Sequence, residues 1–394
     1  MQDPRRRANL QAGFTLIELM VGMVVGLLAV LVITQVLALA EGKKRTVSMG
    51  SDAQINGALA LFTLQRDIAQ AGYGAAAIPE ALGCTAKYQA GTSGTFTLAP
   101  VIINQNGQAN GSDTLTILQA NTTNFSAPMA LTEDTANPPT SATPFKVTSS
   151  LGAAAGNLMV LVPLTRVPNS AQGVLTPAWT MDGTVPCSVF SVTDDAAVTT
   201  TALTATQVPH VNGAGMRAWN QDSVFPAIKV EGNPSVLKSV LLNMGSMVLR
   251  TYSVSAAGNL QGTDLSLTDG SMLPAADLYP QIVKMQAFYG KDTDGDGKVD
   301  AYNKTAPTSN AEWKQVKTLR IAIVARSGQF EKEEVTATAP QWDLGSTIAV
   351  TGTATCNGSS ACLSLDVSAL ADWKHYRYKV YDTIVPLRNV LWHS

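Results

Sequence analysis

The sequence predicts an α+β fold in which a long N-terminal helix packs on a mainly antiparallel β domain. An apolar segment with a single charged residue runs from Phe14 to Ala40, and beyond Tyr73 the chain has short apolar runs but no long amphipathic pattern. Several runs are apolar at almost every position, as expected for strands buried on both faces, so at least two layers must pack together. The clearest of them are 158–164, 239–254 and 316–327.

The segment from Phe14 to Ala40 is long enough to cross a membrane. As a helix it measures about 40 Å, whereas the bilayer core is about 30 Å thick. Basic residues flank it on both sides, at 5–7 and at 43–45. The distribution of positive charge therefore does not decide its orientation.

The helix is expected to continue beyond the membrane to about residue 72, with a bend near Gly42 or Gly50. Its second half carries an apolar stripe at near-helical spacing. The members of this stripe are Ile55, Leu59, Phe62 and Ile68. We interpret the stripe as core that packs against the β domain.

The four cysteines indicate disulfides rather than a zinc site, because none stands in a Cys-x-x-Cys pair. Of the three possible pairings we favour Cys356 with Cys362, across a short loop, and Cys84 with Cys187. Closing the longer loop would stabilise the fold by up to about 4 to 5 kcal/mol. The alternative is four buried free thiols. Disulfides need an oxidising compartment, which places the β domain outside the cytoplasm.

The junction between Gly13 and Phe14 differs from an ordinary secretory cleavage site, because its small residue precedes the apolar segment. A cut there would keep the helix and create an ammonium group on Phe14. Glu18 lies inside the apolar segment, where a carboxylate at mid-membrane depth costs about 2 to 3 kcal/mol. The new ammonium, on the same or a neighbouring helix, would be its partner. The alternative is an ordinary anchor whose Glu18 reaches the headgroups.

The stretch G-FTLIELMV, preceded by basic residues, resembles the class III signal of type IV pilins and type II secretion pseudopilins. This resemblance implies that a prepilin peptidase cuts after Gly13 and methylates Phe14. It also implies that Glu18 guides the subunit into register with its neighbour during assembly.

The segment 292–303, DTDGDGKVDAYN, has oxygen ligands at the spacing of a calcium loop. The expected ligands are Asp292, Asp294, Asp296, the backbone carbonyl of Lys298, Asp300 and Asn303. Because Asn303 replaces the usual bidentate glutamate, we expect modest affinity for a structural Ca²⁺. The alternative is a solvated acidic turn.

Catalysis and nucleic-acid binding have little support. The histidines His210, His375 and His393 share no metal-ligand spacing, and no nucleophile-elbow or phosphate-loop motif occurs, so no catalytic residue is assigned. The net charge is −2, which gives no general attraction to nucleic acid. The basic and aromatic residues of 373–379 alternate as in a half-buried strand, with His375 and Arg377 on one face.

Three C-terminal blocks, IVKMQAFYGKDTDGDGKVDAY, VKTLRIAIVARSG and HYRYKVYDTIVPLRNVLW, resemble PilW-type minor pilins. The resemblance covers the N-terminal helix and roughly the last 120 residues. It divides the chain into a leader (1–13), a pilin-type helix (14–72, with 14–40 in the membrane) and a β-rich domain (73–394). Within that domain lie a polar insertion or subdomain at about 85–221 and the calcium loop at 292–303.

The resemblance implies a low-abundance subunit that primes pilus assembly and ends at or near the filament tip. It would start in the inner membrane with its C-terminal domain in the periplasm and later reach the cell surface. The implied partners are prepilin peptidase, other minor pilins, the major pilin, the inner-membrane assembly platform and a large tip adhesin. The alternatives are a J-type pseudopilin and a calcium-binding surface protein with a pilin-like anchor. J-type pseudopilins are usually much shorter, so length favours the pilus.

Overall fold

The structure is a computed structural model of the 394-residue chain. It describes residues 15–105, 111–122, 127–135, 140–166, 179–181, 183, 185–198, 200–228, 239–346, 348–350, 354–356 and 358–392. The chain forms two compact units, divided between Asp52 and Ala53. We describe each unit by itself.

Helix α1 (Leu16–Gln70) contributes to both units. Its first part, Leu16–Gly42, is long and apolar enough to cross a membrane, and none of its most apolar window is buried within the chain. Its last part, from Ala53 onward, belongs to the second unit and packs against strands there. The α+β fold is therefore confirmed, with an apolar N-terminal helix followed by a mainly antiparallel β domain.

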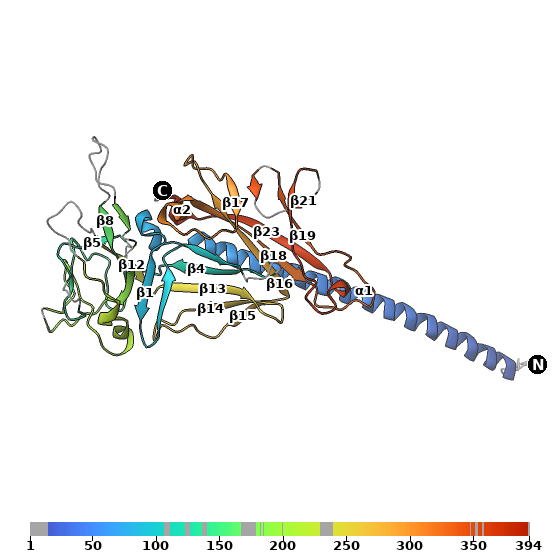
Figure 1. Ribbon diagram of the computed structural model, residues 1–394. Helices are drawn as coiled ribbons and strands as arrows, with labels where there is room; N and C mark the ends of the chain where they lie inside the picture. Colours follow the sequence, from blue (N-terminus) through green and yellow to red (C-terminus); the bar gives the residue numbers. More distant parts are fainter. Residues whose placement is uncertain are drawn as a thin grey trace, which may run out of the picture. The chain divides into compact units, whose positions relative to one another are not determined.

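Two five-stranded sheets form a common core with the last part of α1 (Figure 1). The first has the order β20 (Ala349–Val350), β17 (Ala301–Asn303), β16 (Ile282–Lys291), β18 (Val316–Arg326) and β23 (Tyr378–Pro386). The second has the order β15 (Ala276–Pro280), β14 (Asn259–Asp264), β13 (Val248–Val254), β4 (Thr114–Gln119) and β3 (Val101–Asn104). Every pairing is antiparallel except that of β17 with β20.

A third sheet, of six strands, is formed by strands from the middle of the chain. Its order is β2 (Ser93–Thr97), β1 (Thr85–Gln89), β10 (Cys187–Ser191), β7 (Leu158–Val162), β12 (Val240–Gly245) and β5 (Met129–Ala130). The predicted run 239–254 therefore forms two strands in different sheets, β12 and β13. Strands from the polar stretch 85–221 likewise enter both the second and the third sheet.

The fully apolar runs are explained by cores on both faces of their strands. In β7, Leu158, Val160 and Val162 enter one cluster, whereas Met159 and Leu161 enter another. Strand β18 divides in the same way between the α1 core and a fourth cluster. Because side chains alternate along a strand, a sheet covered on both sides needs apolar residues at successive positions.

The remaining elements are short. The small sheets pair β6 (Phe145–Lys146) with β11 (Gln207–Val208), β8 (Leu164–Arg166) with β9 (Trp179–Met181), and β22 (Ala361–Ser364) with β19 (Gln341–Gly345) and β21 (Ala354–Thr355). The short helices are η1 (Ala75–Ala77), η2 (Pro79–Ala81), η3 (Gly215–Trp219), η4 (Asp222–Val224), α2 (Asn310–Gln315), η5 (Trp373–His375) and α3 (Arg388–Leu391).

The expectation of one strand through 373–379 is wrong in its first half. Trp373–His375 forms η5, and β23 begins only at Tyr378. The backbone N–H of His375 donates a hydrogen bond to the carbonyl of Asp372 at 2.8 Å. The carbonyl of His375 accepts a hydrogen bond from the N–H of Glu331 at 2.9 Å. These contacts take the place of the interstrand backbone hydrogen bonds that a strand would make here.

Candidate functional site

Glu18 and Thr15 form a capping box at the start of α1. Glu18 Oε2 accepts hydrogen bonds from Thr15 N at 3.0 Å and from Thr15 Oγ1 at 2.8 Å, while Thr15 Oγ1 accepts from Glu18 N at 3.3 Å. Such reciprocal bonds satisfy backbone donors that a helix start leaves free. The Thr15 N–H belongs to the peptide after Phe14, so a cut between residues 13 and 14 would preserve the box.

The capping box fixes one oxygen of Glu18 and leaves the other without a partner among the residues that the structure describes. The predicted processing residues Gly13 and Phe14 lie outside the described residues. Sequence reasoning missed Thr15, although a threonine three residues before a glutamate at the start of an apolar run is a known helix-start signal.

The apolar stripe predicted as core in the second half of α1 is wrong for three of its four residues. Ile55, Leu59 and Phe62 are 54%, 47% and 63% exposed, and only Ile68 is buried. The buried face instead carries Ala60 and Leu64, which join Ile68 in the core. A β-carbon at Gly57 would lie 2.4 Å from the Tyr381 ring, so the helix approaches β23 at a position where only glycine fits without a shift. Small residues thus bring this face close to the sheet, and the bulkier stripe stays outside.

The acidic loop joins β16 to β17 and folds around Asp292. This residue is only 4% exposed, and its two carboxylate oxygens accept hydrogen bonds from Gly295 N at 2.7 Å and Gly297 N at 3.1 Å. Both glycines have positive φ, +81° and +85°, which favours glycine at these places. Local backbone bonds therefore fix where the Asp292 carboxylate lies.

Asp292, Asp294 and Asp300 bring their carboxylates together, with one oxygen of each within 4.8 Å of the others. Asp300 also accepts hydrogen bonds from Thr293 N at 2.6 Å and Thr293 Oγ1 at 2.8 Å. These bonds lower the pKa of Asp300, so it stays ionised at neutral pH. Three clustered carboxylates match the hard oxygen donors that Ca²⁺ prefers.

The other predicted ligands have different partners. Asp296 accepts from Lys298 N at 2.8 Å and pairs with its ammonium group at 3.2 Å, outside the carboxylate cluster. Asn303 ends β17, and its side-chain oxygen accepts from Thr305 N at 3.1 Å. The loop therefore presents three of its four predicted carboxylates as one group.

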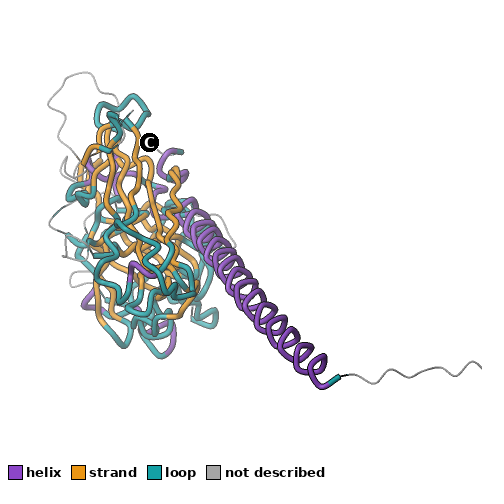
Figure 2. Tube along the Cα trace, turned by 90° about the vertical axis from the view of Figure 1, so that its right-hand side faces the viewer, coloured by secondary structure: helices purple, strands orange, loops and turns teal. Residues whose placement is uncertain are grey.

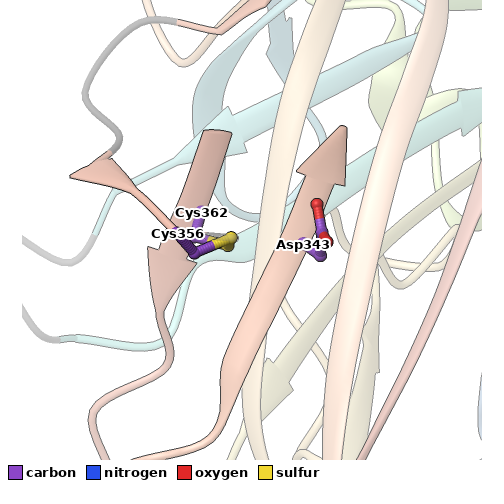
Figure 3. Close-up of side chains that lie close together, drawn as sticks. All are labelled: Asp343, Cys356 and Cys362. Atoms are coloured by element: carbon purple, nitrogen blue, oxygen red, sulfur yellow. A yellow bond between two sulfur atoms is a disulfide. The ribbon is translucent and has the colours of Figure 1, made fainter. Parts of the chain in front are cut away.

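Both favoured disulfides are present. Cys84–Cys187 joins the residue before β1 to the start of β10, with 6.0 Å between Cα atoms, and Cys356–Cys362 closes a short loop with 5.6 Å between them. Figure 3 shows Asp343 beside the second pair. Because these sulfur atoms are bonded to each other, they offer no thiolates to a metal ion.

His210 lies in an aromatic cage in which its ring stacks on Phe145 at 4.1 Å between centroids. Phe190 and Phe225 pack edge-on at 5.4 and 4.7 Å. Burial lowers the pKa of His210 to about 4, so it is neutral at pH 7. The ring thus behaves as part of an apolar core. His393 lies outside the described residues.

Two family models match the chain. The model described as type IV pilus-assembly protein W matches residues 250–389, which include the acidic loop and every strand of the first sheet. The prokaryotic N-terminal methylation motif matches residues 8–34, which include the predicted cleavage junction and the capping box. Neither the curated proteins nor the solved structures contain a match in these comparisons.

Proposed function

Because the chain is a type IV pilin of the PilW type, we propose that it is cut after Gly13 and co-assembles with other minor pilins to prime a type IV pilus. In this proposal it starts in the inner membrane with the β domain in the periplasm, and it ends at or near the pilus tip on the cell surface. Its partners are prepilin peptidase, the other pilins and the assembly platform, and a large adhesin joins it at the tip.

One observation carries this proposal: the methylation motif lies at the start of an apolar helix, and the residues that the structure describes bury none of the most apolar window of that helix. An apolar surface of this length must be covered by lipid or by other apolar helices. The helix of a pilin is covered in each of these ways in turn, first by lipid in the membrane and then by the helices of neighbouring subunits in the filament.

In this proposal, Glu18 sets the register between the helix of one subunit and that of its neighbour. Thr15 holds one carboxylate oxygen, and the other has no partner among the described residues. The methylated ammonium of Phe14 on a neighbouring subunit would meet that oxygen and cancel a charge that is costly in lipid. The exposed stripe of Ile55, Leu59 and Phe62 would continue the subunit contact beyond the membrane.

The processing step is tested by purifying the protein from membranes and reading its N-terminus by mass spectrometry. We expect a chain that begins with N-methyl-Phe14 and co-purifies with other pilins. A Gly13→Leu variant, with a bulky side chain at the junction, should keep its leader. An intact leader on the wild-type protein in piliated cells would refute the proposal.

We also propose that the acidic loop binds one structural Ca²⁺ through Asp292, Asp294 and Asp300. The supporting observation is the convergence of three carboxylates that repel one another without a cation. Binding would neutralise them and hold the turn between β16 and β17. At a calcium concentration a hundred times the dissociation constant, the gain in stability would be about 2.7 kcal/mol.

Two matched variants test the calcium proposal. Asp294→Asn removes a carboxylate from the cluster, whereas Asp296→Asn removes one that pairs with Lys298. Calcium should raise the melting temperature of the wild type and of Asp296→Asn clearly more than that of Asp294→Asn. Equal responses of wild type and Asp294→Asn would contradict the proposed ligand set.

A further inference from the structure

A pocket of about 400 Å³ lies where α1 ends, within the second unit. The ends of α1 and β4, the start of β13 and the C-terminal helix α3 form its walls. Figure 2 shows the C-terminal segment beside the last turns of α1. Asn389 Nδ2 donates to Gln70 O at 3.0 Å and Ala71 O at 3.1 Å, and Ala120 N donates to Tyr73 O at 2.8 Å. These bonds hold the walls together.

Two aromatic residues line this pocket and remain exposed. Trp392 is 77% exposed and Tyr73 is 42% exposed, whereas Trp219, Trp313 and Trp342 are buried. An indole ring that is largely open to solvent at the edge of a pocket offers a flat apolar face to a ligand.

Apart from Asn389, whose amide group holds the end of α1, four polar side chains of the pocket are available to bind a ligand. The carboxamides of Gln70, Gln119 and Asn121 and the guanidinium of Arg388 line it, and in the described part of the chain no side-chain hydrogen bond or ion pair engages them. The Gln119 Oε1 atom is even buried without a partner. Buried polar atoms are normally satisfied, so an unsatisfied acceptor at a pocket wall indicates a missing donor.

The described lining of the pocket carries a positive charge. This described lining contains Arg388 and no carboxylate, so an anionic group would be favoured there. The volume lies near the lower end of the range for ligand pockets, about 300 to 1,000 Å³. A ligand of one or two rings would fill it.

We propose that this pocket binds a short acidic saccharide. A sugar ring has an apolar C–H face that would stack on Trp392 and Tyr73, and edge hydroxyls that would both donate to and accept from the carboxamides. The sugar carboxylate would pair with Arg388. This inference does not depend on how the chain assembles into a filament.

The test uses the full-length mature chain in an amine-oxide detergent, because detergents with sugar headgroups would compete. Sodium D-glucuronate is titrated and followed by saturation-transfer difference NMR, with an expected dissociation constant of about 1 mM for so small a ligand. Trp392→Ala should weaken binding at least about tenfold. Arg388→Gln should weaken glucuronate binding about tenfold and leave methyl β-D-glucoside unaffected.

The control is Ile384→Ala, which changes an exposed apolar residue outside the pocket. This variant should bind glucuronate as the wild type does. Because Trp392 and Arg388 are exposed, their variants should keep the wild-type melting temperature, and Trp392→Phe should retain part of the affinity. Absence of binding at ten times the expected dissociation constant would overturn the proposal. Unchanged binding by Trp392→Ala, or equally strong displacement by inorganic phosphate, would also overturn it.

Discussion

Tyr252→Phe is expected to loosen the attachment of α1 to the second sheet. The buried Tyr252 hydroxyl donates to Asp67 Oδ2 of α1 at 2.5 Å, and Arg250 approaches the same oxygen at 3.5 Å. Burial and the neighbouring carboxylate raise the pKa of Tyr252 well above its usual range, so it remains a donor at any working pH. A hydrogen bond to a charged group contributes about 1.5 to 3 kcal/mol, so we expect a loss of about 2 kcal/mol.

The chain supplies a matched control for this prediction. Tyr279 also reaches α1, where its hydroxyl lies 2.7 Å from Thr63 Oγ1 in a partly buried, neutral contact. Tyr279→Phe should therefore cost about 1 kcal/mol or less. The assay is urea unfolding of the full-length protein in detergent, with hydrogen exchange of residues 53–70 as a local readout. A double-mutant cycle of Tyr252→Phe with Asp67→Asn should give a coupling energy of about 1 to 2 kcal/mol. Equal losses for the two tyrosines, or a coupling energy near zero, would refute the reasoning.

Three further predictions concern other parts of the chain. Phe62→Asp should abolish incorporation into pili while changing the stability of the isolated protein by less than about 0.5 kcal/mol, because Phe62 is 63% exposed; sheared-pilus immunoblots and melting curves measure the two effects. Thr15→Val removes the hydroxyl of the capping box, and we expect fewer pili per cell by electron microscopy than with Thr15→Ser; equal piliation would show that the box has no role. His210 has a folded-state pKa of about 4, below the unfolded value of about 6.5, so wild-type stability should fall as the pH drops from 6.5 to 4. His210→Phe should remove about 3 kcal/mol of that loss in urea titrations at each pH, and parallel pH profiles would contradict this.

The sequence was sufficient for the features that depend on local pattern. Runs such as 158–164 and 316–327 are apolar at successive positions because their strands carry cores on both faces. The cysteine pairing followed from loop length, and the structure has both bonds. These features depend on the alternation of side chains along a strand and on bonds between cysteines, and both can be predicted from the order of residues in the sequence.

The features that the sequence did not predict depend on long-range contacts. Spacing alone could not tell which apolar face of residues 53–70 meets the sheet, because the deciding residues, Gly57 and Ala60, are small and carry little apolar signal. In the acidic loop, Lys298 neutralises Asp296 two residues away, so the acid that looks central by spacing lies outside the cluster. The pocket at the end of α1 joins residues about 320 positions apart, such as Gln70 and Asn389.

The most direct test of the assembly proposal is to ask whether the processed chain enters pili and whether Glu18 is needed for that step. Pili are sheared from cells that make either the wild-type protein or Glu18→Ala, and the peptide that begins at Phe14 is quantified by mass spectrometry in the pilus and membrane fractions. We predict that the wild-type peptide appears in pili at low stoichiometry and that the Glu18→Ala chain is processed but stays in the membrane. Normal pili that lack the wild-type chain, or that incorporate Glu18→Ala equally well, would contradict the account.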